Sequence, residues 1–170
     1  VELLPYLSNQ GVAVNYERRD NVLDLPSIRT LELLADVVLA IFDGRHDVAD
    51  SYLPELLSHP MYGFSAESIW RLSLAAHRNS LSWLETMLVT SEFKPLADWL
   101  LERARQTPHT PLETCLDELI GIPLEAGEDV ATFRSPYYKH YFSKEILEST
   151  PEAYLTVLEA LRTIRTKLRE

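Results

Sequence analysis

The sequence predicts a mainly α-helical protein, an irregular bundle of about seven helices with one short strand near the N-terminus. Three observations predict this class. Apolar residues recur at spacings of three and four over most of the chain, as they do on the buried face of a helix. Only 5 of the 170 residues are glycine, which leaves little material for the tight turns of β-hairpins. Hydrophobic residues make up 46% of the chain and charged residues 25%, proportions that are typical of a folded domain.

The N-terminal part is predicted to combine a short helix with the strand. VELLPYLSNQ, residues 1–10, has a helical pattern that Gly11 can end. VAVNY, residues 12–16, alternates and is β-branched, which predicts a strand. VELLPYL begins in a helical pattern and the C-terminal LRTIRTKLRE stops in one without a cap. We therefore expect this chain to be a piece of a larger protein.

The rest of the chain is predicted to be helical. Pro26 can occupy the first turn of the first of these helices, and Gly44 can end it. Pro54 is expected to kink or divide the second helix. Ser65 and Thr110 are predicted N-caps, whereas residues 122–142 are predicted to be irregular. The predicted helices cover residues 26–42, 47–60, a segment after Ser65, 80–88, 93–106, 110–121 and a segment from about Pro151.

Charge and cysteine content exclude several classes of protein. The formal net charge is −10, and phosphate binding needs clustered Lys and Arg, so a general nucleic-acid binder is not expected. Cys115 is the only cysteine, which rules out an internal disulfide or a cysteine-based zinc site and fits a reducing cytoplasm. No apolar run approaches the roughly 18 residues of a membrane helix, and no leader pattern is present. We expect a cytoplasmic protein that does not contact membranes.

Sequence fingerprints of catalysis are also missing. The glycines lie at positions 11, 44, 63, 121 and 127, and they form neither GxxxxGK[ST] nor GxGxxG. The histidines form no HExxH motif, and no serine lies in a GxSxG elbow. Acidic pairs such as Asp117 and Glu118 are interpreted as solvated helix surface. We therefore expect no catalytic residue, metal site or cofactor in this chain, which would not be an enzyme.

Two charged or glycine-containing stretches have more than one interpretation. The first carries Arg18, Arg19, Asp20 and Asp24, and is either a salt-linked surface loop or part of a hinge. The second is MYGFSAESIW, residues 61–70, a glycine-containing turn that opens a helix. Backbone N–H groups at such a turn can hold a phosphate, although an ordinary helix entry has the same pattern.

A third stretch is FRSPYYKHYFSK, residues 133–144, in which aromatic residues alternate with cations that include Arg134 and Lys139. Aromatic faces beside cations suit nucleic-acid bases and phosphates. The same pattern suits a loop that its tyrosines clamp onto the core. If the stretch binds nucleic acid, a basic face on the last helix would extend it, formed by Arg162, Arg165 and Arg169.

The order of these elements resembles the UvrD/Rep/PcrA family of superfamily 1 DNA helicases. A helix LLPYLSNQGV, a strand AVNY, a charged loop and a helix opened by PSIRTLELLADVVLAI follow one another. In that family the chain leaves the second RecA-like domain in this order and enters an inserted helical arm, subdomain 2B. Residues 11–14 would stand for the family's G-I-P-Y strand, and residues 27–29 for its E-I-[KR] motif.

Later motifs keep the family's order over nearly the whole chain. LLSHPMYGFSAESIWRL resembles the family's N-x-P-x-R-G-I-G-x-x-[ST] turn, with Pro60, Gly63, Phe64 and Ser65 in register. Tyr62 and Ser65 stand where the family often has an arginine and a second glycine. HTPLETCLDELIG and AYLTVLEALRTI resemble two later helices of the arm, and FRSPYYKHYF is nearer to the divergent helicases that also carry a nuclease domain.

The resemblance implies a division of the chain and a role for each part. Residues 1–25 would be the edge of the RecA-like motor domain and a hinge, and residues 26–170 would be the helical accessory domain. The hinge would use Arg18, Arg19, Asp20 and Asp24. DNA contact, weak or absent for this chain alone, would use Tyr62, Gly63, Phe64, Ser65, Arg134 and Lys139.

The implied function is an accessory, regulatory or DNA-positioning role in an ATP-dependent helicase that acts in DNA repair or recombination. ATP and magnesium would bind to the parent protein, and the motor domains would be partners in cis. A different interpretation is a stand-alone module that docks a protein partner through its Trp and Tyr surface. Direct nucleic-acid binding through residues 133–144 is a third.

Overall fold

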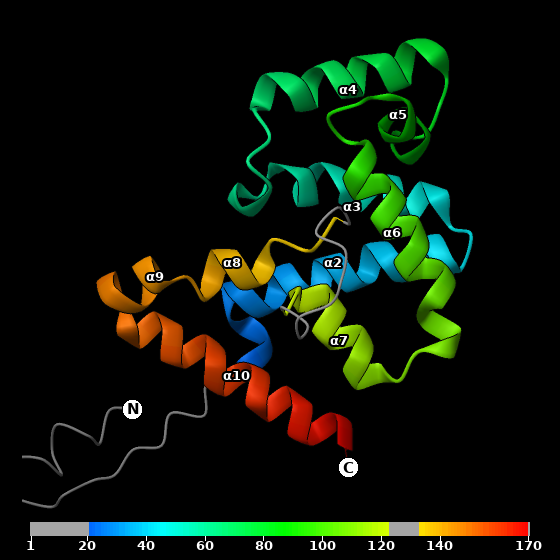
Figure 1. Cartoon of the computed structure of the whole chain (residues 1–170). Helices are drawn as coiled ribbons and strands as arrows, with labels where there is room; N and C mark the ends of the chain where they lie inside the picture. The colour runs from blue at the N-terminus through cyan, green and yellow to red at the C-terminus, as the bar shows by residue number, and fades with distance from the viewer. Residues whose placement is uncertain (1–20, 123–132, 170) are drawn as a thin grey trace, which may run out of the picture.

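The computed structural model describes residues 21–122 and 133–169, and it confirms the mainly α-helical fold (Figure 1). The seven helices predicted from Pro26 onward correspond to α2–α7 and α10. Two shorter helices, α8 and α9, are absent from the prediction. The predicted helix at residues 1–10 and the predicted strand at residues 12–16 lie outside the described residues.

Short 3₁₀ segments and turns connect the helices. Three of these segments are η1 Val22–Asp24, η2 Pro60–Tyr62 and η3 Thr107–His109. The helices are α2 Pro26–Phe42, α3 His46–Ser58, α4 Ala66–Asn79, α5 Trp83–Val89, α6 Lys94–Gln106, α7 Leu112–Ile120, α8 Tyr137–Tyr141, α9 Lys144–Ser149 and α10 Pro151–Arg169.

Helix α2 is the centre of the bundle. Pro26 opens it as predicted, because a fixed φ and a missing N–H suit the first turn. Helices α3, α6, α7 and α10 all pack against α2, and Figure 1 shows it crossing the middle of the molecule between them. Its buried apolar residues therefore extend around much of its circumference: Ile28, Leu31, Leu34, Val37, Val38, Ala40 and Ile41.

Helix α3 continues through Pro54, so the proline does not divide it. A proline inside a helix costs about 3 kcal/mol, because it removes one backbone hydrogen bond and crowds the preceding turn. The burial of Leu53, Leu56 and Leu57, which are fully inaccessible to solvent, offsets this cost. Tertiary packing thus overrides the local signal.

The predicted helix starts are correct at Ser65 and wrong at Thr110. The Ser65 hydroxyl accepts a hydrogen bond from the Ser68 N–H at 3.0 Å and so caps α4. The Thr110 hydroxyl instead donates to the carbonyl of Gln106 at 2.9 Å, which satisfies the end of α6. Helix α7 consequently begins at Leu112 with Pro111 as its N-cap residue.

The predicted irregular segment 122–142 contains helix α8, so that prediction is wrong for residues 137–141. Two pairs of aromatic side chains four residues apart support this turn of helix. The rings of Tyr137 and Tyr141 lie 4.6 Å apart, and those of Tyr138 and Phe142 lie 5.4 Å apart. Across the ranges 21–122 and 133–169, no helix combines the length and the apolar character that crossing a membrane requires.

Candidate functional site

The turn between α3 and α4 holds four of the residues predicted to contact DNA. Two of them direct their side chains toward the core. The ring of Tyr62 stacks on that of Phe64 at 6.0 Å, and Phe64 packs on the buried Phe93 at 4.5 Å. The Tyr62 hydroxyl is buried and has no hydrogen-bond partner among the residues that the structure describes, and burial raises its pKa. Both aromatic side chains therefore serve packing.

The other two predicted residues of the turn, Gly63 and Ser65, shape the entry to α4. Gly63 has a φ of 71°, which favours glycine, and Ser65 is occupied as the N-cap. Glu67 follows in the first turn of α4 and forms an ion pair with Arg71. A carboxylate there stabilises the helix and repels a phosphate. The local arrangement is that of an ordinary helix entry.

The end of α3 is joined to α8 by a polar cluster, the His59 cluster, which consists of Thr30, His59, His140 and Tyr141. The Nε2 atom of His59 lies 3.3 Å from the Thr30 hydroxyl and 3.3 Å from the Tyr141 hydroxyl. The rings of His59 and His140 meet edge to face at 5.4 Å. The structure thus brings residues from α2, the α3–α4 turn and α8 together.

The tautomer of His59 follows from its hydrogen bonds. Its Nδ1 atom accepts from the backbone N–H of Met61 at 3.3 Å, so the proton of the neutral ring lies on Nε2. Burial, and to a lesser extent the neighbouring His140, lower the pKa of His59. The neutral imidazole is therefore the form that caps η2 and completes the cluster.

Residues 133–142 are clamped onto the core by their aromatic side chains. Tyr137 is completely buried, and its hydroxyl donates to the carbonyl of Ser27 at 3.1 Å. Phe133 packs on Trp99 at 5.7 Å, and Phe142 meets Tyr154 edge to face at 5.2 Å. These rings occupy the interior face of the segment, as expected of the clamp interpretation.

The two cations predicted to bind DNA, Arg134 and Lys139, are both exposed on this clamped segment. They do not form the contact between the α3–α4 turn and α8, which His59 makes with His140 and Tyr141. The DNA contact of Arg134 and Lys139 stays a prediction.

The predicted hinge lies mostly outside the described residues, which include Asp24 but not Arg18, Arg19 or Asp20. Asp24 ends η1 and forms a 3.0 Å ion pair with Arg29 of α2. Both side chains are mostly exposed, and exposed pairs contribute little to stability. Such a pair can be broken at small cost.

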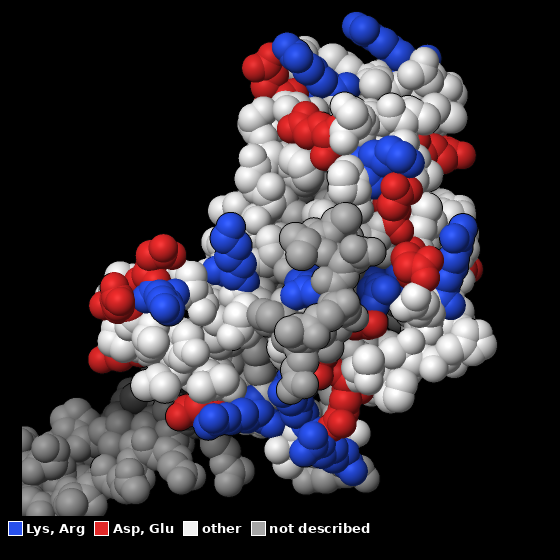
Figure 2. Space-filling model, viewed as in Figure 1, with Lys and Arg blue, Asp and Glu red and all other residues white. Residues whose placement is uncertain are grey.

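The arginines of α10 do not form a free basic face. Arg165 pairs with Asp117 and Arg169 pairs with Glu113, so two ion pairs link α10 to α7 in register. Arg162 is exposed. On the face in Figure 2, Lys and Arg side chains are interspersed with Asp and Glu rather than gathered into one basic patch.

An apolar groove runs along α2 and is called here the α2–α7 groove. It consists of two adjoining hollows of about 430 and 230 Å³. The two hollows share four lining residues, one of α2 and three of α7, namely Ala35, Leu112, Cys115 and Leu119. The larger hollow extends to α6 and η3, and the smaller one extends to η1 and α10.

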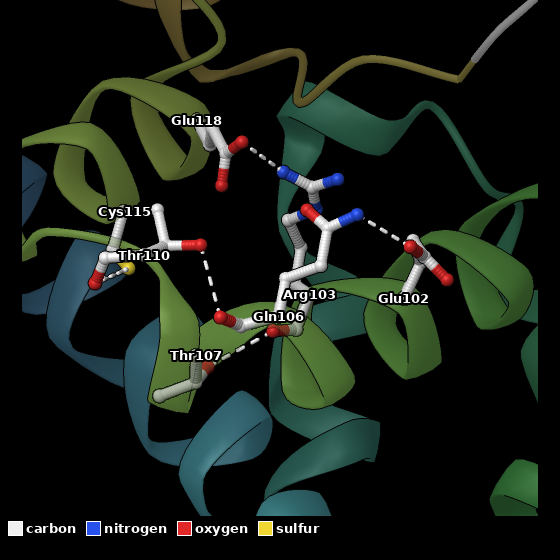
Figure 3. Close-up of polar contacts among 7 residues, drawn as sticks. All are labelled: Glu102, Arg103, Gln106, Thr107, Thr110, Cys115 and Glu118. Carbon is white, nitrogen blue, oxygen red and sulfur yellow. Dashed lines mark hydrogen bonds and ion pairs between the residues drawn. The ribbon is translucent and has the colours of Figure 1, made fainter.

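The wall of the groove formed by α6, η3 and α7 has its polar groups engaged internally (Figure 3). Arg103 of α6 reaches Glu118 of α7 in a largely buried ion pair. The Thr107 hydroxyl donates to the Arg103 carbonyl at 2.9 Å, and the Cys115 thiol contacts the Thr110 carbonyl at 3.6 Å. The wall therefore presents mostly hydrocarbon to the groove.

The groove contains one thiol, that of Cys115. Burial and the nearby Glu118 raise the pKa of Cys115, which disfavours the thiolate that a nucleophile requires. Over the ranges 21–122 and 133–169, no cluster of three or more His, Cys, Asp or Glu could hold a metal ion. Arg103 pairs with Glu118 through its Nη1 atom, and its buried Nε atom has no acceptor within the described part of the chain.

Leu39 and Phe42 continue the apolar helical spacing of α2, a pattern that is typical of core residues, but the structure exposes nearly half of each. Periodicity locates an apolar stripe but does not show whether a neighbour covers it. The His59 cluster has no sequence signal either, because Thr30, His59 and Tyr141 are far apart in the chain. A lone histidine before a proline is not a recognisable motif.

No family model, no curated protein and no solved structure matches the chain. The likeness to the UvrD/Rep/PcrA helicases therefore remains a prediction from the order of short motifs.

Proposed function

We propose that this chain is a helical accessory arm of a bacterial UvrD-like superfamily 1 DNA helicase that acts in DNA repair or recombination. The arm would contribute by position, turning on its connections to gate or regulate unwinding by motor domains elsewhere in the same protein. It would hydrolyse no ATP itself. The proposal rests on the order of the sequence motifs and on one feature of the fold.

That feature is the place where the chain enters and leaves the bundle. Leu23, just before α2, and Leu168, at the end of α10, line the same hollow. Helix α10 also packs directly against α2, and Figure 1 shows it passing beneath the start of that helix. Adjacent entry and exit points are what a domain inserted into another domain needs. This observation carries the proposal.

The geometry favours a positional role over strong DNA binding. Tyr62 and Phe64 pack inward, and Glu67 places a negative charge at the N-terminus of α4. Arg165 and Arg169 are paired with carboxylates of α7. Any contact of the arm with a DNA duplex would be weak and would use exposed cations such as Lys139.

The decisive test is the reading frame that encodes the chain. The proposal expects a Walker A motif upstream of residue 1 and further helicase motifs downstream of residue 170. A reading frame that encodes only these residues would overturn the proposal.

Two assays of the purified chain complement this test. We expect no ATP hydrolysis with or without DNA, and only millimolar-range or undetectable binding to a fluorescent DNA duplex at physiological salt. ATP hydrolysis by a homogeneous preparation of the chain would contradict the proposal. Tight binding that weakens as salt rises would instead support a direct nucleic-acid binder, since phosphate contacts release counterions.

A further inference from the structure

Large apolar residues gather along the α2–α7 groove although they remain exposed. Ten large hydrophobic side chains are exposed in the described residues, and four of them line this groove. Scattered exposed leucines are ordinary, whereas a contiguous group beside a hollow marks an interaction surface. The four are Leu23, Leu39, Leu112 and Leu168, with exposed fractions of 53, 46, 62 and 37%.

The shape of the groove matches a helix lying along α2. On α2 its lining runs from Ile28 to Leu39, which is about 16 Å at 1.5 Å per residue. That length equals about three turns of a second helix laid beside α2. The two hollows lie along this line, so they could receive apolar side chains that are one or two turns apart on the second helix.

The residues that line the groove carry more negative than positive charge. Glu32, Asp36 and Glu118 supply three carboxylates, and Arg103 supplies one guanidinium. Arg103 is already paired with Glu118. In the part of the chain that the structure describes, Glu32 and Asp36 form no ion pair with any cation.

The cations nearest to the groove on α10 are already engaged. Arg165 and Arg169 pair with Asp117 and Glu113 of α7. The two unpaired carboxylates lie one helical turn apart on α2, so they form a short acidic row beside the apolar floor. Only an occupant that brings its own positive charge would complement this row.

We propose that the α2–α7 groove binds an amphipathic helix of a protein partner, with leucine-like residues on one face and Lys or Arg at its border. The apolar face of the partner would cover Leu39 and Leu112, and its cations would pair with Glu32 and Asp36. This binding role goes beyond the proposed helicase arm and does not depend on it.

The test uses two helical peptide probes of about 12 residues, long enough to span the groove. The basic probe is LKKLLKLLKKLL, and the matched acidic probe is LEELLELLEELL. Each carries a fluorophore, and its binding to the whole chain is followed by anisotropy at physiological salt. We expect the basic probe to bind at least tenfold more tightly than the acidic probe. Equal affinities would overturn the proposal.

Paired variants locate the binding site of the basic probe. Leu39→Ser with Leu112→Ser should weaken binding tenfold or more, whereas Leu155→Ser, at a leucine exposed outside the groove, should change it less than twofold. Equal loss, or no loss, in both variants would overturn the proposal. Circular dichroism checks that each variant remains helical.

Charge variants distinguish attraction of the probe by the acidic row from attraction by the overall negative charge of the chain. Glu32→Gln with Asp36→Asn should weaken binding and its dependence on salt, and Asp47→Asn with Glu55→Gln removes the same charge from α3 as a control. A control that weakens binding equally would show that net charge, not the groove, attracts the probe, and would overturn the proposal.

Other occupants of the groove have their own signatures. A concentration-dependent dimer that Leu112→Ser dissociates would show that a second copy of the chain covers the groove. A tenfold rise in peptide affinity on Leu3→Ser with Leu4→Ser would assign the groove to residues 1–10. Either result would overturn the proposal.

Discussion

Helix α2 separates two regions of contrasting construction. At its N-terminal half, the His59 cluster and the aromatic clamp of residues 133–142 are closed: Tyr137 is fully buried and bonded to the Ser27 carbonyl. Along another face, the α2–α7 groove is open, and Leu112 is largely exposed. One region uses aromatic and polar groups that contact one another, and the other presents aliphatic groups that the described residues leave exposed.

The packing of these two regions is the opposite of what their sequence patterns indicate. Residues 133–144 mix aromatic side chains with cations, a pattern of ligand-binding surfaces, yet their rings pack into the bundle. Leu39 continues the apolar stripe of α2, a pattern of core residues, yet it is exposed. Composition indicates which side chains can bind, and packing decides which remain available to do so.

The largest expected effect is at the closed region. Tyr137→Ala should lower the free energy of unfolding by about 3–5 kcal/mol, the usual cost of removing a buried aromatic ring. Tyr138→Ala, at a half-buried ring stacked on Phe142, should cost clearly less. Urea unfolding of both variants measures the difference. Equal costs would show that the clamp is not anchored through Tyr137.

A second prediction concerns the contact between the end of α7 and the clamp. A Cβ at Gly121 would lie 2.2 Å from the Ser135 carbonyl oxygen, whereas a Cβ at Gly44 would meet nothing within 4 Å. Both glycines have similar positive φ values, so Gly44→Ala is a matched control for backbone strain. Gly121→Ala should destabilise the protein by about 1–3 kcal/mol more than Gly44→Ala. Similar losses in urea unfolding would contradict the close approach.

The third prediction is a pH dependence that belongs to the closed region. Because the pKa of His59 is lowered in the folded protein, the unfolded chain takes up a proton more readily. The contribution of His59 to stability is complete above its ordinary pKa of 6.5 and is lost as the pH falls from there through the lowered pKa of the folded protein. His59→Gln should reduce the difference between unfolding free energies at about pH 7.5 and 5.5.

The control for this prediction is His109→Gln, at an exposed position in η3. Urea unfolding of this variant should show the same loss between the two pH values as the unmodified chain. If His59→Gln also left the loss of unfolding free energy between the two pH values unchanged, protonation of His59 would not affect the stability of the fold.

The smallest effect is expected at the open region. Leu112→Ser should change the unfolding free energy by no more than about 0.5 kcal/mol, because an exposed side chain loses few contacts. Leu116→Ser, one turn away and buried, should cost several times more. A large loss on Leu112→Ser in thermal or urea unfolding would mean that the groove is covered in solution.

Local signals made much of the fold predictable. Pro26 and Ser65 begin helices, and Gly121 ends one, because each position has a backbone requirement that the residue type meets. Thr110 was harder to place, since its hydroxyl can cap the next helix or bond to the preceding carbonyl, and the geometry selects the second. Helix α8 is too short to be recognised without its aromatic packing.

The candidate surfaces were much less predictable than the helices. Thr30, His59 and Tyr141 meet only because α8 folds back onto α2, and no local pattern encodes that contact. The groove likewise depends on where α6 and α7 stop covering α2. The predicted DNA-contacting and hinge residues remain predictions, and Arg18, Arg19 and Asp20 lie outside the described residues.

The proximity of η1 and α10, which line one hollow, also determines how the bundle would respond to a pulling force. Because Leu23 and Leu168 line one hollow, tension between the two ends of the bundle acts first on the contact of α10 with α2 and α7. The pairs of Arg165 and Arg169 with α7 then resist the peeling of α10. Helices α3 to α5 lie off this line of force, so they would keep their packing while α10 detaches.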